Sequence, residues 1–278
     1  MNSLVSVVCL LLATVTTLNG QDFGLNGPEC GISGSLMRVI NGSTARNAQF
    51  PWMAKLELYY SLYAADPYTC GASIITRRHV LTAAHCMIEN GRRAVRTDVV
   101  YGHADVQLAR RVPVLNMLIH ESYSDIAILL VAQPFQFSQA VRPLCVLTRR
   151  MYLLNRKAIA AGWGRTQQGK TPGTDDLQYT ILKIVPNNVC RSYFPTSYDP
   201  RTMLCARCRY STVCLGDSGG PLFVKSRHGR FVQVGIASFI VGNMTCCTSK
   251  ANVFTRVRAY MPWIKEAIAK LRAHGYFK

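Results

Sequence analysis

Short apolar runs separated by turn-forming residues are the feature of this sequence that most limits its possible folds. The runs are rich in Val, Ile, Leu and Ala, and Gly, Pro, Asn or Asp stands between them. They include MAKLEL, GASIIT, HVLTAA, DVVYG, IAILLV, FVQVGIASFIV and NVFTRV. Runs of this length at this spacing are typical of an all-β sandwich or barrel and do not fit alternating strands and helices.

A single amphipathic helix is expected near the C-terminus, over about residues 260–272. Its apolar residues recur at helical spacing and form one face, which we expect to pack on the β core. Pro262 stands in the first turn, where a helix tolerates proline. The residues of this face are Tyr260, Trp263, Ile264, Ala267, Ile268 and Leu271.

The N-terminal segment is typical of a secretory signal peptide, which we expect to cover residues 1–20. No charged residue occurs up to Leu18, and the run from Leu4 to Leu18 is mostly apolar but short for a membrane span. A short membrane anchor is the alternative for this run. The signal-peptide interpretation predicts a secreted protein.

The number of cysteines agrees with export. The sequence has 11 cysteines, and removal of Cys9 with the signal leaves an even number. In an oxidising compartment an even set indicates a disulfide framework. Zinc is not expected, because the C-x-x-C spacing of Cys205 and Cys208 occurs without a second such motif, and Cys246 and Cys247 are adjacent.

The chain is strongly basic, with a net charge of +18 from 32 basic and 14 acidic residues. The basic residues are scattered, many as Arg pairs, and neither a lysine-rich tail nor a nucleic-acid-binding motif is present. For an exported protein the expected anionic partners are glycosaminoglycans, acidic glycoproteins or anionic membrane surfaces, and not nucleic acid. The alternative is that the charge serves solubility alone.

Ser218 lies in the glycine-rich run CLGDSGGP, which is ambiguous by itself. Glycines around a serine are common in turns, and the run also fits the nucleophile elbow of α/β-hydrolases. A nucleophilic serine needs a base and a third group that orients the base. In an α/β-hydrolase the base follows the serine, which leaves only His228 and His274. Neither histidine is a convincing base, and the predicted strands do not alternate with helices as they do in an α/β-hydrolase.

Two segments before Ser218 provide better partners for it. VLTAAHC puts His85 beside a cysteine, and SDIAILLV puts Asp125 at the head of an apolar strand. The order His85, Asp125, Ser218 matches a known catalytic arrangement. The chain from Arg38 to Lys278 closely resembles the chymotrypsin-like serine proteases. The resemblance rests on RVING, CGASIITRRHVLTAAHC, SDIAILL, AGWGR, CLGDSGGPL, VGIASF and NVFTRV.

The resemblance implies an all-β fold of two antiparallel six-stranded β-barrels, with the catalytic cleft between them and the helix at the C-terminus. The protease domain would cover residues 39–278. Its N-terminal barrel would span about residues 39–150 and its C-terminal barrel about residues 151–257.

The resemblance also implies a role for each matched residue of the site. Ser218 would attack the scissile carbonyl, with His85 as general base and then general acid. Asp125 would orient the His85 imidazole and stabilise its charged form. The backbone N–H groups of Gly216 and Ser218 would form the oxyanion hole.

The segment RVING implies that the protein is made as a zymogen. In the family, cleavage after a basic residue frees a β-branched N-terminus, which folds inward and pairs with the Asp before the nucleophile. Here the cut would follow Arg38, and the Val39 ammonium would meet Asp217, because a buried charge needs a partner. Residues 21–38 would be a propeptide tethered through Cys30. An activating trypsin-like protease is therefore an expected partner.

A set of disulfides follows from the same resemblance. The implied pairs are Cys30–Cys145, Cys70–Cys86, Cys190–Cys205, and Cys214 with Cys246 or Cys247. Cys208 and whichever of Cys246 and Cys247 remains would form a fifth bridge. One bridge of the family is missing, because Ala158 and Val224 stand at its two ends.

The residues of the primary specificity pocket predict a preference for small side chains. In the family the residue six before the nucleophile forms the pocket floor, and an Asp there selects Lys or Arg. Here that residue is Thr212, which is neutral. Ser238 also belongs to the pocket. Near it, two glycines of the family's pocket walls are replaced, by Ile240 and by Asn252, so an elastase-like preference for Ala, Val or Ser at P1 is expected. A chymotrypsin-like preference is the alternative, because an extended segment follows Ser238.

No metal or cofactor is expected, since the segment after Gly102 lacks the paired glutamates of the family's calcium loop. Asn41 and Asn243 begin glycosylation sequons. We expect a monomer whose partners are protein or peptide substrates and protease inhibitors. The opposing hypothesis is a weakly active or non-catalytic member of the family that binds polyanions. The intact triad and the Arg38-Val39 sequence argue against it.

Overall fold

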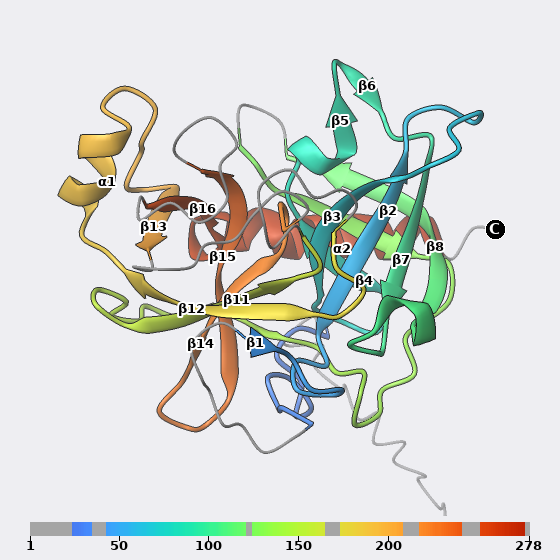
Figure 1. Ribbon diagram of the computed structural model, residues 1–278, viewed down its shortest axis with the longest axis horizontal. Coiled ribbons are helices and arrows are strands. Elements are labelled where there is room, and N and C mark those ends of the chain that lie inside the picture. Colours follow the sequence, from blue (N-terminus) through green and yellow to red (C-terminus); the bar gives the residue numbers. More distant parts are fainter. Residues whose placement is uncertain are drawn as a thin grey trace, which may run out of the picture.

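The protein contains two β-barrels that lie beside each other, with helix α2 (Met261–Gly275) running behind them (Figure 1). The computed structural model describes residues 24–34, 43–120, 124–164, 173–207, 217–240 and 251–275. Within these ranges, no helix is both long and apolar enough to cross a membrane.

The first barrel is a closed antiparallel sheet of six strands. Around the barrel they are β2 (Met53–Tyr59), β3 (Tyr68–Ile74), β4 (His79–Thr82), β9 (Ala127–Val131), β8 (Arg110–Ile119) and β7 (Arg96–Tyr101). Every residue of β9 is buried, which explains its unbroken apolar sequence AILLV. Beyond its first residue β2 instead alternates between buried and half-buried positions, as a strand with one face on the core does.

The second barrel also has six strands in its ring. They are β12 (Gln178–Ile184), β11 (Lys157–Gly162), β14 (Pro221–Lys225), β15 (Phe231–Ile240), β16 (Asn252–Arg256) and β13 (Met203–Arg207). Pairing between β12 and β13 closes the ring. The prediction of two six-stranded antiparallel barrels is therefore confirmed.

Shorter elements join and extend the barrels. β1 (Ser43–Thr44) pairs with β12, and β10 (Cys145–Val146) runs parallel to β15. β5 (Ile88–Glu89) and β6 (Arg92–Arg93) form a separate hairpin. The short helices are η1 (His85–Met87), η2 (Val106–Leu108), η3 (Val257–Tyr260) and α1 (Asn187–Tyr193).

Helix α2 follows the second barrel in sequence but packs on the first. It contacts β8 and β9, and its buried residues belong to the core of the first barrel. Those residues are Met261, Ile264, Ala267, Ile268 and Leu271. At the end of β8, the His120 ring packs against the rings of Tyr260 and Trp263, with centroids 5.2 and 5.1 Å away. The predicted apolar face of this helix is confirmed.

An aromatic cluster joins the entry of the first barrel to the second. Phe50 and Trp52 precede β2, and both rings pack edge-on against Phe223 of β14 at 5.3 Å between centroids. Trp52 also lies 5.4 Å from Phe231 of β15. All four side chains are buried, so this cluster stabilises the barrel interface through the apolar area it removes from water.

The first described segment docks along the second barrel. A disulfide joins Cys30 to Cys145 of β10. The carboxamide of Asn26 donates to the Val146 carbonyl over 3.0 Å and accepts from the Val146 N–H over 2.7 Å. Arg230 donates to the Cys30 carbonyl over 2.9 Å. The segment is thus held by hydrogen bonds between side chains and backbone groups as well as by the disulfide.

Three disulfides are present in the described part of the chain, and they are the pairs that the resemblance implies. They join Cys30 to Cys145, Cys70 to Cys86 and Cys190 to Cys205. The bridges predicted for Cys208, Cys214, Cys246 and Cys247 lie outside the described residues. Ala158 and Val224, at the site of the missing bridge, are both buried in the core of the second barrel.

Candidate active site

His85 and Asp125 meet because of the pairing between β4 and β9. These strands are antiparallel, with Thr82 opposite Ala127. His85 lies in η1 just beyond β4, and Asp125 lies just before β9, so both leave the sheet at the same end. A disulfide from Cys86 to β3 restrains η1 further.

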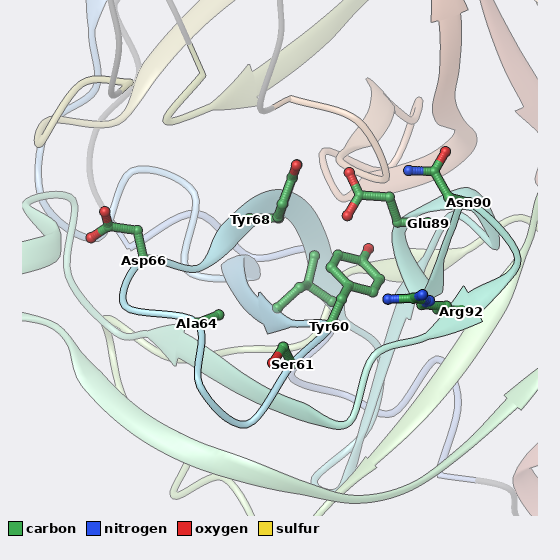
Figure 2. Close-up of a pocket in the computed structure, with 9 residues that line it drawn as sticks. Tyr60, Ser61, Ala64, Asp66, Tyr68, Glu89, Asn90 and Arg92 are labelled. Carbon is green, nitrogen blue, oxygen red and sulfur yellow. The ribbon is translucent and has the colours of Figure 1, made fainter.

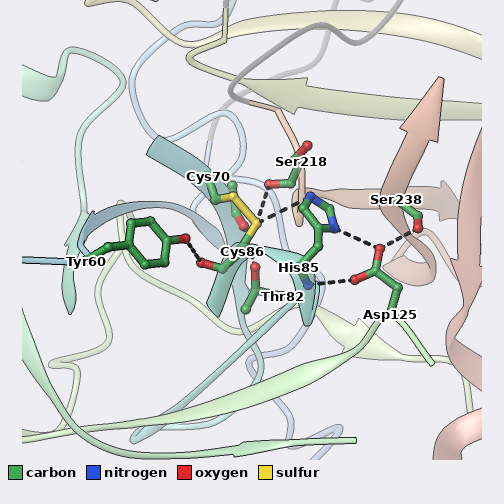
Figure 3. The surroundings of a disulfide bond; sticks show 9 residues. Tyr60, Cys70, Thr82, His85, Cys86, Asp125, Ser218 and Ser238 are labelled. Atoms are coloured by element: carbon green, nitrogen blue, oxygen red, sulfur yellow. Dashed lines mark hydrogen bonds and ion pairs between the residues drawn. A yellow bond between two sulfur atoms is a disulfide. The ribbon is translucent and has the colours of Figure 1, made fainter. Parts of the chain in front are cut away.

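Asp125 contacts His85 through two hydrogen bonds, which Figure 3 shows. The His85 Nδ1 and Asp125 Oδ2 atoms are 2.8 Å apart, and the His85 backbone N–H donates to Oδ1 over 2.9 Å. Ser238 of β15 donates its hydroxyl to the same Oδ2. Thr255 of β16 donates its hydroxyl to the Asp125 carbonyl over 2.8 Å. The second barrel therefore contributes two of the contacts that fix this residue of the first barrel.

The Asp125 carboxyl is held in its ionised form. Burial by itself raises the pKa of this carboxyl, but hydrogen bonds from His85 and Ser238 favour the charged form. Together with the charge interaction with His85 they outweigh burial, and the pKa lies below its ordinary value. The Asp125 side chain is 22% exposed and the His85 side chain 43%. The carboxylate is thus sheltered while the imidazole faces solvent.

The contact with Asp125 determines which nitrogen of His85 can accept a proton. An ionised carboxylate only accepts hydrogen bonds, so Nδ1 carries the hydrogen and Nε2 of the neutral ring has the lone pair. Nε2 lies 3.8 Å from Cys86 Sγ, which lies 3.6 Å from the Ser218 carbonyl oxygen. Figure 3 shows Ser218 on the Nε2 side of the ring, away from Asp125.

Backbone hydrogen bonds to both barrels fix the position of Ser218 and of the turn that follows it. Gly71 of β3 donates its N–H to the Ser218 carbonyl over 2.7 Å, and Gly219 donates to the Ala237 carbonyl over 2.8 Å. Gly219 has a φ of +78°, and a Cβ there would lie 2.2 Å from Thr82 Oγ1. Only glycine fits this position, where the turn passes between the two barrels.

Comparison with known proteins assigns the family. Residues 39–264 match the family profile described as "Trypsin". The chain belongs to the trypsin family of serine proteases. This assignment confirms the resemblance that the motifs predict.

Relatives of the chain include a protein named as a venom protease and a much longer proteinase. The chain is similar to the "Venom serine protease Bi-VSP" of Bombus ignitus, with 33% identity over 85% of this chain and 70% of the relative. It is also similar to the "Serine proteinase stubble" of Drosophila melanogaster, with 30% identity over 86% of this chain. The chain spans only 32% of that proteinase.

A solved structure supports the same fold. The structure titled "HL collagenase" is 26% identical in sequence, with a TM-score of 0.70. The similarity covers 82% of this chain and 97% of the collagenase chain. The chain therefore shares its overall fold with this collagenase.

The residue before Ser218 points into the protein. Asp217 Oδ1 accepts a hydrogen bond from the Gly164 N–H over 3.0 Å. Gly162 faces the same carboxylate, since a Cβ there would come within 2.0 Å of Asp217 Oδ1. The carboxylate thus occupies a cradle that only glycine at position 162 permits.

A groove lies beside the imidazole on the Asp125 side. Its volume is about 590 Å³, within the range of roughly 300–1,000 Å³ that is typical of ligand pockets. Met203, Phe239 and Tyr260 provide apolar surface along it. Such a groove can hold substrate side chains next to His85.

Asn252 is a buried polar residue on the strand next to Ser238. In the pairing of β15 with β16, Asn252 lies opposite Ile240. Asn252 is 2% exposed, and its Nδ2 makes no hydrogen bond in the described part of the protein. A side chain, not a glycine, therefore occupies space at this position inside the barrel.

Several residues that the sequence singles out lie outside the described residues, and their roles stay predictions. They are Arg38, Val39, Asn41, Thr212, Gly216 and Asn243, and the side chain of Ile240. The oxyanion hole, the activation site, the pocket floor and both sequons therefore rest on the sequence.

Sequence reasoning did not find the contacts that Asp125 makes with the second barrel. The sequence places Ser238 in the pocket wall and indicates no role for Thr255, although the hydroxyls of both donate to Asp125. The only signal was their presence in the motifs VGIASF and NVFTRV.

The cysteines beside His85 do not form a metal site. Ligand-type atoms of Cys70, His85 and Cys86 lie within 4.8 Å of one another. Both sulfur atoms belong to one disulfide, so neither is a thiolate that can bind a metal.

Proposed function

We propose that this protein is a serine endopeptidase that uses Ser218, His85 and Asp125 as its catalytic triad. The observation that carries the proposal is the hydrogen bond between His85 Nδ1 and the ionised Asp125, with Ser218 on the Nε2 side of the ring. This arrangement leaves a proton acceptor on the side of the imidazole where Ser218 lies, as nucleophilic catalysis requires. Membership of the trypsin family supports the same reaction.

The first half of the reaction forms an acyl-enzyme. Ser218 Oγ attacks the carbonyl carbon of the substrate, and its proton passes to His85 Nε2. Asp125 stabilises the resulting imidazolium through its ionised carboxyl. The N–H groups of Gly216 and Ser218 stabilise the negative oxygen of the tetrahedral intermediate. The intermediate collapses, and His85 gives its proton to the leaving amine.

The second half releases the acyl group. A water molecule attacks the ester carbon, and His85 Nε2 takes the proton of that water. The C–O bond to Ser218 then breaks, and the proton returns to the Ser218 oxygen. The products are a free carboxylic acid and the regenerated serine.

Activation is proposed to follow cleavage after Arg38. The freed Val39 ammonium would approach Asp217, and the cradle of Gly162 and Gly164 around that carboxylate supports an inward-facing partner for it. Residues 21–38 would remain attached through Cys30 and its disulfide to β10.

We propose a preference for a small P1 residue. The neutral Thr212 argues against Lys or Arg at P1, and Ile240 and Asn252 stand where the family has two glycines in the pocket walls. The burial of Asn252 supports a narrowed pocket. A chymotrypsin-like preference is the second candidate.

Secretion and polyanion binding complete the proposal. Export is supported by the N-terminal segment, the three disulfides and the similarity to a protein named as a venom protease. The net charge of +18 supports binding to glycosaminoglycans or other polyanions. A heparin column with a salt gradient tests the polyanion binding. If the protein elutes near physiological salt, the binding is only nonspecific attraction.

The deciding experiment is fluorophosphonate labelling after cleavage at Arg38. We expect label on Ser218, little label before cleavage, and none on Ser218→Ala. As a matched control, Ser192→Ala removes an exposed hydroxyl of α1 and leaves labelling unchanged. Label that persists in Ser218→Ala, or its absence from the cleaved parent, contradicts the proposal. Substrates with Ala, Val, Phe or Lys at P1 then test the pocket. Rapid turnover of the P1 Lys substrate would contradict the proposal that the neutral Thr212 forms the pocket floor.

A further inference from the structure

A second cavity lies on the opposite side of His85 from the groove. It has a volume of about 480 Å³ and is lined by residues of β2, β3, the loop between these strands, and the hairpin β5–β6. Tyr60 in its wall donates its hydroxyl to the Cys86 carbonyl over 2.7 Å. Because Cys86 follows His85 and its sulfur contacts Ser218, the cavity begins next to the triad. Figure 3 shows Tyr60 and Asp125 on opposite sides of His85.

Two tyrosines and a carboxylate surround this cavity, as Figure 2 shows. The Tyr60 and Tyr68 rings are in edge-to-face contact, with centroids 5.4 Å apart. Glu89 projects beside them and interacts with the Tyr68 side chain. Tyr68 is 59% exposed, so an aromatic surface is open to solvent beside a carboxylate.

The cavity is acidic although the chain is strongly basic. Asp66 and Glu89 line it with one cation, Arg92, which lies opposite Glu89 in the β5–β6 pairing. Burial and then the charge of Glu89 raise the pKa of Tyr60 to about 12. The interaction with Glu89 raises the pKa of Tyr68. The Glu89 carboxylate thus contributes to both shifts.

We propose that this cavity binds a lysine or arginine side chain of the polypeptide substrate. The proposal rests on the proposed function, because it places the substrate across Ser218. One end of that substrate follows the groove beside Asp125, and the other crosses the Cys70–Cys86 disulfide to the cavity. The Glu89 carboxylate accepts a charge-assisted hydrogen bond, and the tyrosine rings bind the cation through their faces.

The preference is therefore local and runs against the charge of the whole molecule. A net charge of +18 repels cationic peptides at long range, and salt screens that repulsion. Recognition by Glu89 and the tyrosine rings acts at contact distance and discriminates between shapes as well as charges. Citrulline has nearly the shape of arginine without its charge, so it isolates the proposed contact.

The test measures peptide binding to the Ser218→Ala protein after cleavage at Arg38. Fluorescently labelled peptides carry Val for the primary pocket and one Arg, placed in turn at three positions on either side. Each has a citrulline counterpart, and anisotropy gives both dissociation constants. We expect one or two positions, all on the same side of Val, where Arg binds about tenfold tighter than citrulline, the size typical of a hydrogen bond to a charged group.

Two substitutions with opposite expected effects on the arginine preference test the cavity itself. Glu89→Gln keeps the shape of the side chain and should reduce the ratio of citrulline to arginine dissociation constants to less than twofold. Arg92→Gln removes the competing cation and should raise that ratio. Glu266→Gln, an exposed carboxylate on α2, is the matched control and should not change it. Equal binding of the two peptides, or a preference that survives Glu89→Gln, overturns the proposal.

Binding and catalysis are read out separately in this design. The binding assay uses a protein without its nucleophile, so it reports on the cavity even if the parent enzyme fails to hydrolyse peptides. Fluorophosphonate labelling of the parent reports on the proposed function alone. Labelling without an arginine preference thus contradicts only the cavity, and an arginine preference without labelling contradicts only the endopeptidase.

Discussion

Ser238 donates its hydroxyl to Oδ2 of Asp125, the same carboxylate oxygen that pairs with Nδ1 of His85. The contact links β15 of the second barrel to the residue before β9 of the first. It helps to hold the pKa of the Asp125 carboxyl below its ordinary value against the opposing effect of burial. The proposed base is therefore oriented by groups from both barrels.

Ser238→Ala is expected to lower kcat/KM by about tenfold, the effect of one hydrogen bond to a charged group. Without that bond the Asp125 pKa rises, so the variant should also lose activity at a higher pH than the parent on acidification. A pH profile of kcat/KM with a small-P1 substrate measures both effects. An unchanged profile would mean that the contact is only structural.

Gly162→Ala is expected to abolish activation without unfolding the protein. The new Cβ would come within 2.0 Å of Asp217 Oδ1, so the carboxylate must leave its cradle. We expect the rate of fluorophosphonate labelling after cleavage to fall at least a hundredfold, while circular dichroism is retained. Gly27→Ala is the control, because its Cβ would meet only the flexible Glu29 side chain at 3.2 Å. Normal labelling of Gly162→Ala would show that the position of Asp217 does not matter.

Asn252→Gly is expected to widen the primary pocket. The Asn252 side chain is buried and its Nδ2 has no hydrogen-bond partner within the described ranges, so its removal frees space without breaking a hydrogen bond of that nitrogen. We expect the ratio of kcat/KM for P1 Phe over P1 Val to rise at least tenfold. Asn155→Gly, at an exposed left-handed position with a φ of +61°, should not change the ratio. A constant ratio in Asn252→Gly would place this side chain outside the pocket.

His79 is expected to make the folded protein less stable in acid. It is 1% exposed, and burial, followed by the charges of Arg272 and Arg78, lowers its pKa to about 3 from an ordinary 6.5. Thr76 Oγ1 accepts from the backbone N–H groups of Arg78 and His79, so its own hydrogen points to His79 Nδ1 over 2.7 Å. Protonation of Nδ1 would break that bond and bury a charge.

The pH dependence of stability follows from this shift. Below pH 6.5 the unfolded chain binds a proton at His79 that the folded protein does not, so stability falls as the pH drops from 6.5 toward 3. The slope is at most about 1.4 kcal/mol per pH unit, or about 2 kcal/mol between pH 6.5 and 5. Urea unfolding of His79→Gln in the Ser218→Ala background should lose this slope. His228→Gln, at an exposed histidine, should retain it.

The sequence predicts those parts of the protein that depend on local pattern. The apolar run after Asp125 became the buried strand β9, and the helical spacing after Tyr260 became α2. Family motifs supplied the order of the site residues, since no periodicity indicates that His85 and Asp125 meet. The bond from Ser238 to Asp125 spans 113 residues of sequence, and the cavity beside Tyr60 combines two separate hairpins. Such contacts depend on how each barrel closes and how the two barrels pack together. The pattern of residue types along the chain does not encode this.

The position of α2 has a consequence for how the protein is made. The helix is the last described element of the chain, yet its apolar face completes the core of the barrel that is synthesised first. That barrel cannot complete its core on the ribosome until the helix residues have emerged. We therefore expect the first barrel to reach its final packing only when the second barrel has also been synthesised.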